Sequence, residues 1–84
     1  MQLLSQIKPG SKVIVEKLTG SGALRRRMLD MGIVPGAELE VVRRAPLGGP
    51  LQLKLRGYYL AMRREECAQI QVTPLYFENH SLVG

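Results

Sequence analysis

The sequence predicts a mainly β fold, a small barrel of about five short strands with one short α-helix inserted after the first strand. Most of the chain alternates apolar and polar residues, which is the pattern of half-buried strands. Segments that contain proline and glycine separate these runs and indicate turns. One stretch, residues 24–31, instead spaces its apolar residues for a helix. A sheet of short strands can pair the backbone groups of its edge strands by curling into a barrel, so we expect a partly open SH3-like barrel.

Residues 51–56 carry the clearest strand signal, because three leucines alternate there with three polar residues. Gly57 predicts a tight reversal after this strand. Residues 58–62 then return as its hairpin partner. Tyr58 and Tyr59 point to opposite faces of the returning strand, so we expect one of the two in the core.

Three further runs, residues 12–18, 37–44 and 69–73, have the composition of strands. A Pro-Gly pair precedes each of the first two runs and predicts a type II turn. Residues 63–68 are polar and predict a turn or a single turn of helix. The apolar residues expected in the core are Val13, Val15, Leu24, Met28, Leu39, Val41, Leu51, Leu53, Leu55, Ile70 and Val72.

The segment from Leu24 to Met31 predicts one short helix. Leu24, Met28 and Met31 fall at i, i+4 and i+7, so they share one face. Gly32 suits the left-handed residue that commonly follows the end of a helix. We therefore expect an apolar inner face packed on the barrel and a basic outer face.

The outer face of this helix carries the candidate partner-binding residues Arg25, Arg26, Arg27 and Asp30. The adjacent arginines repel one another, and Asp30 is placed to pair with either Arg26 or Arg27 along the helix. An acidic partner surface would relieve the remaining repulsion. Leu47, in a loop with two prolines and two glycines, has no obvious core to enter and is a candidate apolar anchor.

The charge pattern points to an anionic partner. The formal charge is +5, and seven of the twelve basic residues lie in three runs, at residues 25–27, 43–44 and 63–64. A merely solubilising role stays open. No run of about 18 apolar residues occurs and the N-terminus lacks a signal-peptide pattern, so we expect no membrane insertion. A single cysteine fits the reducing cytoplasm.

The chain has few side chains that could form a catalytic site, so we expect that it is not an enzyme. The chain has one histidine, one cysteine and no phosphate-binding loop. As weak metal candidates it offers Cys67 and His80, with Glu65 and Glu66 nearby in sequence. Cys67 is better explained as a small buried hydrophobe and His80 as a solvated tail residue. We expect no required cofactor, while a weak Fe(II) or Zn(II) site shared between two chains stays open.

Nucleic-acid binding is the alternative from another class. Gly10, Val13, Val15 and Gly20 loosely fit the opening pattern of ribosomal-type SH3-like modules, and the basic runs could contact phosphate. Binding of a single strand also uses exposed aromatic rings, and the expected burial of one hairpin tyrosine leaves no such platform. We therefore expect no nucleic-acid partner.

Several motifs keep the order and spacing of a known family. They are Leu24 with residues 29–36, then residues 39–41, 45–50, 60–63 with Glu66, and 70–72. Over roughly residues 3–73 the chain resembles the FeoA family of small bacterial ferrous-iron transport proteins. Cys67 stands where that family often has alanine, and the tail from Leu75 onward has no counterpart.

The resemblance implies an SH3-like domain over residues 1–74 and a C-terminal extension over residues 75–84. It implies a cytoplasmic accessory protein of ferrous iron uptake that docks to and regulates the membrane transporter FeoB, whose cytosolic part hydrolyses GTP. Similar domains occur at the end of metal-responsive transcription repressors, so a regulator domain is a further alternative. Weak self-association also stays open.

Overall fold

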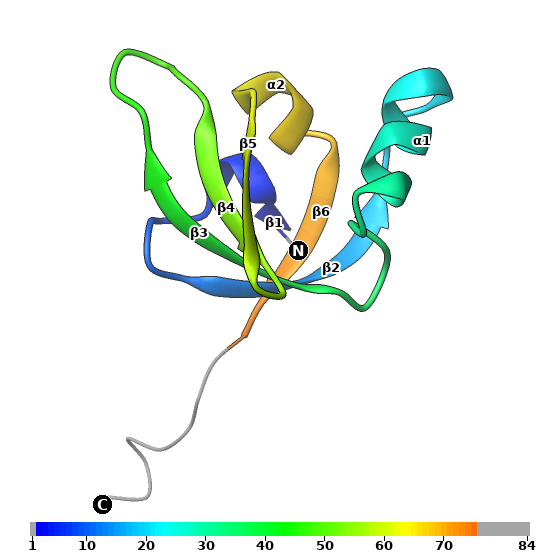
Figure 1. Ribbon diagram of the computed structural model, residues 1–84, viewed down its shortest axis with the longest axis horizontal. Coiled ribbons are helices and arrows are strands. Elements are labelled where there is room, and N and C mark those ends of the chain that lie inside the picture. Colours follow the sequence, from blue (N-terminus) through cyan, green and yellow to red (C-terminus); the bar gives the residue numbers. More distant parts are fainter. Residues whose placement is uncertain (1, 76–84) are drawn as a thin grey trace, which may run out of the picture.

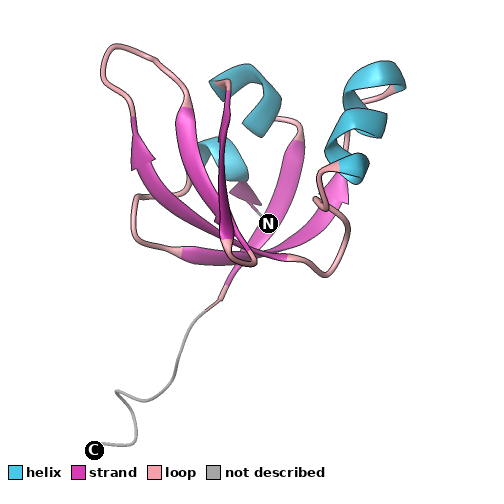
Figure 2. Cartoon of the chain, in the orientation of Figure 1, coloured by secondary structure: helices cyan, strands magenta, loops and turns pink. Residues whose placement is uncertain are grey.

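Six antiparallel strands form one curved sheet in the computed structural model, which describes residues 2–75 (Figure 1). Neighbouring strands follow the order β1-β6-β2-β3-β4-β5, so β1 and β5 are the edges of the sheet. Figure 2 shows the strands wrapped into an open barrel with helices beside its rim. The elements are β1 (Gln2–Leu3), the 3-10 helix η1 (Leu4–Gln6), β2 (Lys12–Leu18), α1 (Gly22–Asp30), β3 (Glu38–Arg44), β4 (Leu51–Leu55), β5 (Tyr58–Met62), α2 (Arg64–Cys67) and β6 (Ile70–Pro74). The mainly β prediction is confirmed.

The first strand was not predicted from the sequence. β1 pairs its residues Gln2 and Leu3 with Val72 and Gln71 of β6. A strand of two residues has no alternation that a pattern could detect. It leads into η1, whose Leu4 is fully buried. The N-terminal segment therefore completes the sheet and adds a leucine to the core.

The core lies inside the curved sheet, and η1, α1 and α2 each add a buried side chain to it, Leu4, Met28 and Cys67. All predicted core residues on the strands are buried. Met28 of α1 is also fully buried, whereas Leu24 and Met31 are only partly buried against the core. α1 is short and lies beside the barrel (Figure 1), and it reaches the core through its last turn, where Met28 lies, while its first turn does not. No helix within residues 2–75 is long and apolar enough to cross a membrane.

The expectation that one hairpin tyrosine enters the core is wrong. Tyr58 and Tyr59 are 43% and 57% exposed. Tyr58 shares the inward side of β5 with buried Met62, but it lies at the turn end of the hairpin, where its hydroxyl donates to the Met31 carbonyl. Tyr59 lies on the outer face, with the Lys54 ammonium 5.7 Å from its ring centroid. The absence of exposed aromatic rings is therefore no longer an argument against nucleic-acid binding.

A β-bulge separates the roles of two adjacent arginines. The register shifts between Val41 and Arg43, after which Arg43 lies opposite Gln52 and Arg44 opposite Leu51. Arg44 is half-buried, and its guanidinium donates one hydrogen bond to the Ser5 carbonyl and another, of 3.1 Å, to the Ile7 carbonyl. Arg44 thus fixes the N-terminal segment to the barrel, while Arg43 stays exposed.

The turn at Pro35-Gly36 carries a first testable prediction. Gly36 has φ +93°, and the Ala37 N–H donates to the Val34 carbonyl at 2.9 Å, which confirms a type II turn. An added Cβ at Gly36 meets nothing within 4 Å, so only the backbone penalises a side chain. We expect Gly36→Val to cost about 1–3 kcal/mol, because a β-branched residue is strained at this φ.

Thermal melting checks this prediction. The valine variant should melt roughly 5–20 °C below the parent, while Gly36→Asn, which tolerates left-handed φ, should lose much less. Equal decreases in melting temperature for the valine and asparagine variants would contradict the explanation by the positive φ of Gly36.

Candidate functional site

The register of the sheet brings two of the basic runs to one end of the barrel. Arg44 of β3, Leu51 of β4 and Met62 of β5 lie in a row across the three strands. The 45–50 loop joins two members of that row, and Arg63 directly follows the third. The loop and the start of α2 therefore rise from the same rim, at the top of Figure 1.

An ion pair fixes α1 to the same end. The Arg27 Nη2 atom lies 2.5 Å from the Glu66 Oε2 atom of α2. Glu66 also accepts a hydrogen bond of 3.0 Å from the Arg63 backbone N–H. Burial by itself raises the pKa of Glu66, but the Arg63 N–H and the Arg27 guanidinium outweigh it and hold that pKa below its usual value. The pair therefore stabilises the fold at neutral pH, and this contribution is lost as the pH falls through the lowered pKa.

This ion pair replaces the one expected from the sequence. Within residues 2–75 no ion pair joins Asp30 to Arg26 or Arg27. A surface pair along one helix contributes only about 0.2–0.5 kcal/mol, whereas the Glu66 carboxylate is largely buried and held by a second hydrogen bond. Arg25 and Arg26 remain exposed, with no anionic partner in the described part of the chain.

The exposed arginines at this end come from α1, from β3 and from residues 63–64, where α2 begins. They are Arg25, Arg26, Arg43, Arg63 and Arg64, and with the 45–50 loop we name them the basic end. From the sequence, only the α1 arginines were assigned to the candidate partner-binding surface, while the runs at residues 43–44 and 63–64 were noted only for their charge. Arg63 and Arg64 could have been found from the predicted hairpin, because antiparallel pairing places the residues just before and just after it near one another. Arg43 is brought to the same end by its pairing with Gln52 of β4.

Leu47 is the apolar tip of the basic end. Its side chain is 103% exposed, and its φ is +60°. Gly48 follows with φ +76°, and the Gly49 N–H donates to the Pro46 carbonyl at 3.2 Å, which closes a left-handed turn of type I′. Glycine, asparagine and aspartate favour this conformation, and leucine does not. Full exposure to solvent and a positive φ are both unfavourable for leucine, so Leu47 is a candidate functional residue.

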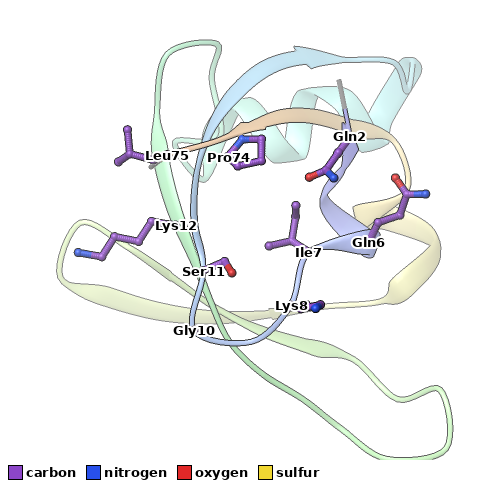
Figure 3. Close-up of a pocket in the computed structure, with 9 residues that line it drawn as sticks. All are labelled: Gln2, Gln6, Ile7, Lys8, Gly10, Ser11, Lys12, Pro74 and Leu75. Carbon is purple, nitrogen blue, oxygen red and sulfur yellow. The ribbon is translucent and has the colours of Figure 1, made fainter. Parts of the chain in front are cut away.

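A separate hollow of about 450 Å³ lies between the N-terminal segment and the end of β6 (Figure 3). Ile7 and Pro74 project into it, while the Lys12 side chain points away. The lining residues are Gln2, Gln6, Ile7, Lys8, Gly10, Ser11, Lys12, Pro74 and Leu75. This set holds no carboxylate, imidazole or thiol, so it offers a metal ion no strong ligand.

The sequence-predicted metal candidates do not meet in the described residues. Residues 2–75 hold no group of three or more His, Cys, Asp or Glu side chains that could bind a metal ion. Cys67 is fully buried, and burial, with a smaller effect of Glu66, raises the pKa of its thiol to about 12. Cys67 thus lies in the apolar core and belongs to no group of metal ligands within residues 2–75. His80 lies outside the described residues.

We propose accordingly that the isolated chain binds Fe(II) and Zn(II) only weakly. After dialysis at micromolar protein concentration, it should retain far less than one metal ion per chain. Cys67→Ala should leave that small amount unchanged, because the parent thiol is buried in the apolar core. Stoichiometric metal in the parent and its loss in the alanine variant, measured by elemental analysis, would contradict this prediction.

Fold and surface together define a small SH3-like β-barrel domain with a basic rim. A family model described as the FeoA domain matches residues 2–74. The chain belongs to the FeoA family, and membership implies a role in ferrous iron transport.

Similar proteins agree with this assignment. A Porphyromonas gingivalis protein described as a fusion of Fe(2+) transport protein A with the Fe(2+) transporter FeoB is 36% identical over 69 residues, which is 82% of this chain and 8% of the fusion. The FeoA structure from Chlorobium tepidum has a TM-score of 0.84 and 41% identity, covering 89% of this chain and 71% of that one. A zinc complex of Stenotrophomonas maltophilia FeoA, described as a procaryotic SH3 domain protein, has a TM-score of 0.77 and 26% identity, covering 87% and 91%.

Proposed function

We propose that this chain is a non-enzymatic cytosolic accessory protein of ferrous iron uptake that docks to and regulates a FeoB-type transporter on its GTP-hydrolysing side. The observation that carries the proposal is the fusion, in which a domain 36% identical to this chain shares one polypeptide with FeoB. A covalent link holds two domains at an effective concentration on the order of millimolar. Such a link is useful when the two domains act on one another.

The basic end supplies the chemistry for docking. Arg25 and Arg26 are exposed and lack a carboxylate partner in residues 2–75, so an acidic partner surface would neutralise them. Leu47, held clear of the barrel, can enter an apolar pocket of the partner. Charge would then guide association, and the leucine would slow dissociation.

Charge reversal tests this proposal. We expect Arg25→Glu/Arg26→Glu to slow association with the transporter's cytosolic domain at least about tenfold at low salt, because steering by the basic end is lost. The difference should shrink as salt rises from about 50 to about 500 mM. The readout is a kinetic binding assay, with GTP hydrolysis by that domain measured in parallel.

The control variant Lys8→Glu/Arg56→Glu makes the same change in net charge outside the basic end. It should bind within about twofold of the parent if location matters more than net charge. Equal association rates for the parent and for Arg25→Glu/Arg26→Glu at every salt concentration would exclude the basic end. Salt-sensitive retention of the parent on a labelled RNA or DNA oligonucleotide, without binding to the transporter domain, would favour the nucleic-acid alternative.

A further inference from the structure

The sheet has one long unpaired edge, and it is formed by β5. β5 pairs only with β4, and the opposite edge is the two-residue strand β1. In Figure 1 the strand β5 accordingly has β4 on one side only. An unpaired edge presents backbone donors and acceptors to any extended chain that reaches it.

The β4–β5 hairpin determines which groups of β5 are free. Its two-residue turn has φ +44° at Arg56 and +89° at Gly57, as in type I′, and Leu55 lies opposite Tyr58. In a hairpin of this kind the flanking pair exchanges backbone hydrogen bonds, and every second pair after it does the same. The N–H and C=O groups of Tyr59 and Ala61 therefore point away from β4.

Those groups are accessible and unbonded in the described residues. Tyr59 is 57% exposed and Ala61 is also exposed. No hydrogen bond within residues 2–75 reaches the backbone of either residue on its free side. Residues two apart on a strand repeat at about 6.8 Å, so the pair offers two donors and two acceptors at the spacing of an added antiparallel strand.

The outer face beside this edge can receive side chains of such a strand. A shallow groove of about 380 Å³ runs from the 45–50 loop to β5. Its lining residues are Arg43, Ala45, Pro46, Pro50, Gln52, Tyr59, Leu60 and Ala61. Every second side chain of a strand added beyond β5 would project on this face of the sheet.

The charges around the edge select the occupant. Arg56 precedes β5, Arg63 and Arg64 follow it, and Lys54 lies beside it on the outer face. A second copy paired antiparallel through β5 and centred on Leu60 would set Met62 of each chain opposite Tyr58 of the other, and so bring Arg63 and Arg64 of one chain near Arg56 of the other. Like charges brought close together are destabilising, so self-pairing is disfavoured and an acidic peptide is favoured.

We propose that the free edge of β5 is a strand-addition site for an extended peptide segment rich in Asp and Glu. Backbone hydrogen bonds to Tyr59 and Ala61 supply the binding, and the flanking arginines supply the preference for acidic residues. The proposal needs neither Leu47 nor the α1 arginines. It shares Arg63 and Arg64 with the basic end, but variants of Leu47, Arg25 and Arg26 test the docking to the transporter without changing the β5 edge.

The test uses the full chain and a blocked peptide, about ten residues long, that alternates valine or threonine with glutamate. We expect the amide signals of Tyr59 and Ala61 to shift in NMR spectra and their hydrogen exchange to slow when this peptide is added. The same peptide with lysine in place of glutamate should bind at least about tenfold more weakly at low salt. Methylation of the peptide backbone nitrogens that face β5 should abolish binding to the parent chain.

Substitution of Ala61 provides the matched protein variants. Ala61→Pro removes a free edge N–H without removing a bond of the β4–β5 ladder, so the fold should persist and peptide affinity should fall at least about tenfold. Ala61→Thr keeps the N–H and should bind within about twofold of the parent. Equal binding of the methylated and unmodified peptides, or of the lysine and glutamate peptides, would overturn the proposal. So would shifts of the Tyr59 and Ala61 signals with protein concentration alone, which would mean pairing between two copies of the chain.

Discussion

Replacing Leu53 by alanine is expected to lower the free energy of unfolding by about 2–5 kcal/mol. Leu53 is fully buried in the middle of β4, opposite Val41 of β3 and Leu60 of β5. Both neighbouring strands are held by backbone ladders, so the cavity left by the missing atoms can close only in part. A domain of this size has a total stability of about 4–12 kcal/mol, so the loss brings the variant close to unfolding.

Urea unfolding of Leu53→Ala and Leu47→Ala checks this expectation with the same chemical change at two sites. Leu53 is fully buried, whereas Leu47 is 103% exposed, so the second variant should stay within about 0.5 kcal/mol of the parent. Comparable decreases in the free energy of unfolding for the two variants would contradict the assignment of Leu53 to the core.

Replacing Leu47 by asparagine is expected to have opposite effects on stability and on binding. Asparagine tolerates the φ of +60° that leucine adopts at a cost, so the variant should gain up to about 1 kcal/mol in the free energy of unfolding. The same change removes the only apolar side chain at the tip of the 45–50 loop. If Leu47 is an anchor, the affinity for the transporter's cytosolic domain should fall by about 30-fold, which corresponds to about 2 kcal/mol.

Leu47→Met is the matched control, because it keeps an apolar side chain of similar volume. It should bind within a few-fold of the parent. Asparagine and methionine variants that both bind as tightly as the parent would show that Leu47 makes no contact with the transporter. A loss of binding that accompanies a lowered melting temperature would indicate a structural role for the residue.

Much of the fold was predictable because its signals are local. The alternation in residues 51–55 predicted β4, and the Pro-Gly pair before residue 37 predicted the turn that leads into β3. The helical spacing of Leu24, Met28 and Met31 predicted α1. Each of these patterns is set by neighbours in the chain, so a tertiary contact is not needed to recognise it.

The features that were not predicted from the sequence depend on contacts between residues far apart in the chain. The bulge between Val41 and Arg43 turns Arg44 inward, and no local pattern shows it. The Arg27–Glu66 pair joins residues 39 positions apart and replaces the local pair expected for Asp30. A prediction based on helix spacing alone therefore found the arginines but assigned one of them the wrong partner.

One of Tyr58 and Tyr59 was expected in the core, and the exposure of both was not predicted, for a related reason. Alternation shows which face of a strand a residue occupies, but not how far the core extends along that face. Tyr58 lies on the inward side beyond the filled part of the barrel, and Tyr59 lies on an edge strand. The free backbone groups of β5 likewise became visible only with the order of the strands.

The measurement that tests the proposed docking most directly is an NMR titration of the isotope-labelled chain with the unlabelled cytosolic domain of the transporter. Amide signals of the basic end, from residues 22–27, 45–50 and 63–64, should shift or broaden first, and Arg25→Glu/Arg26→Glu should weaken the effect. The signals of the opposite turn, at Arg56 and Gly57, should stay in place. An unchanged spectrum at saturating partner concentration, or changes confined to that opposite turn, would contradict docking through the basic end.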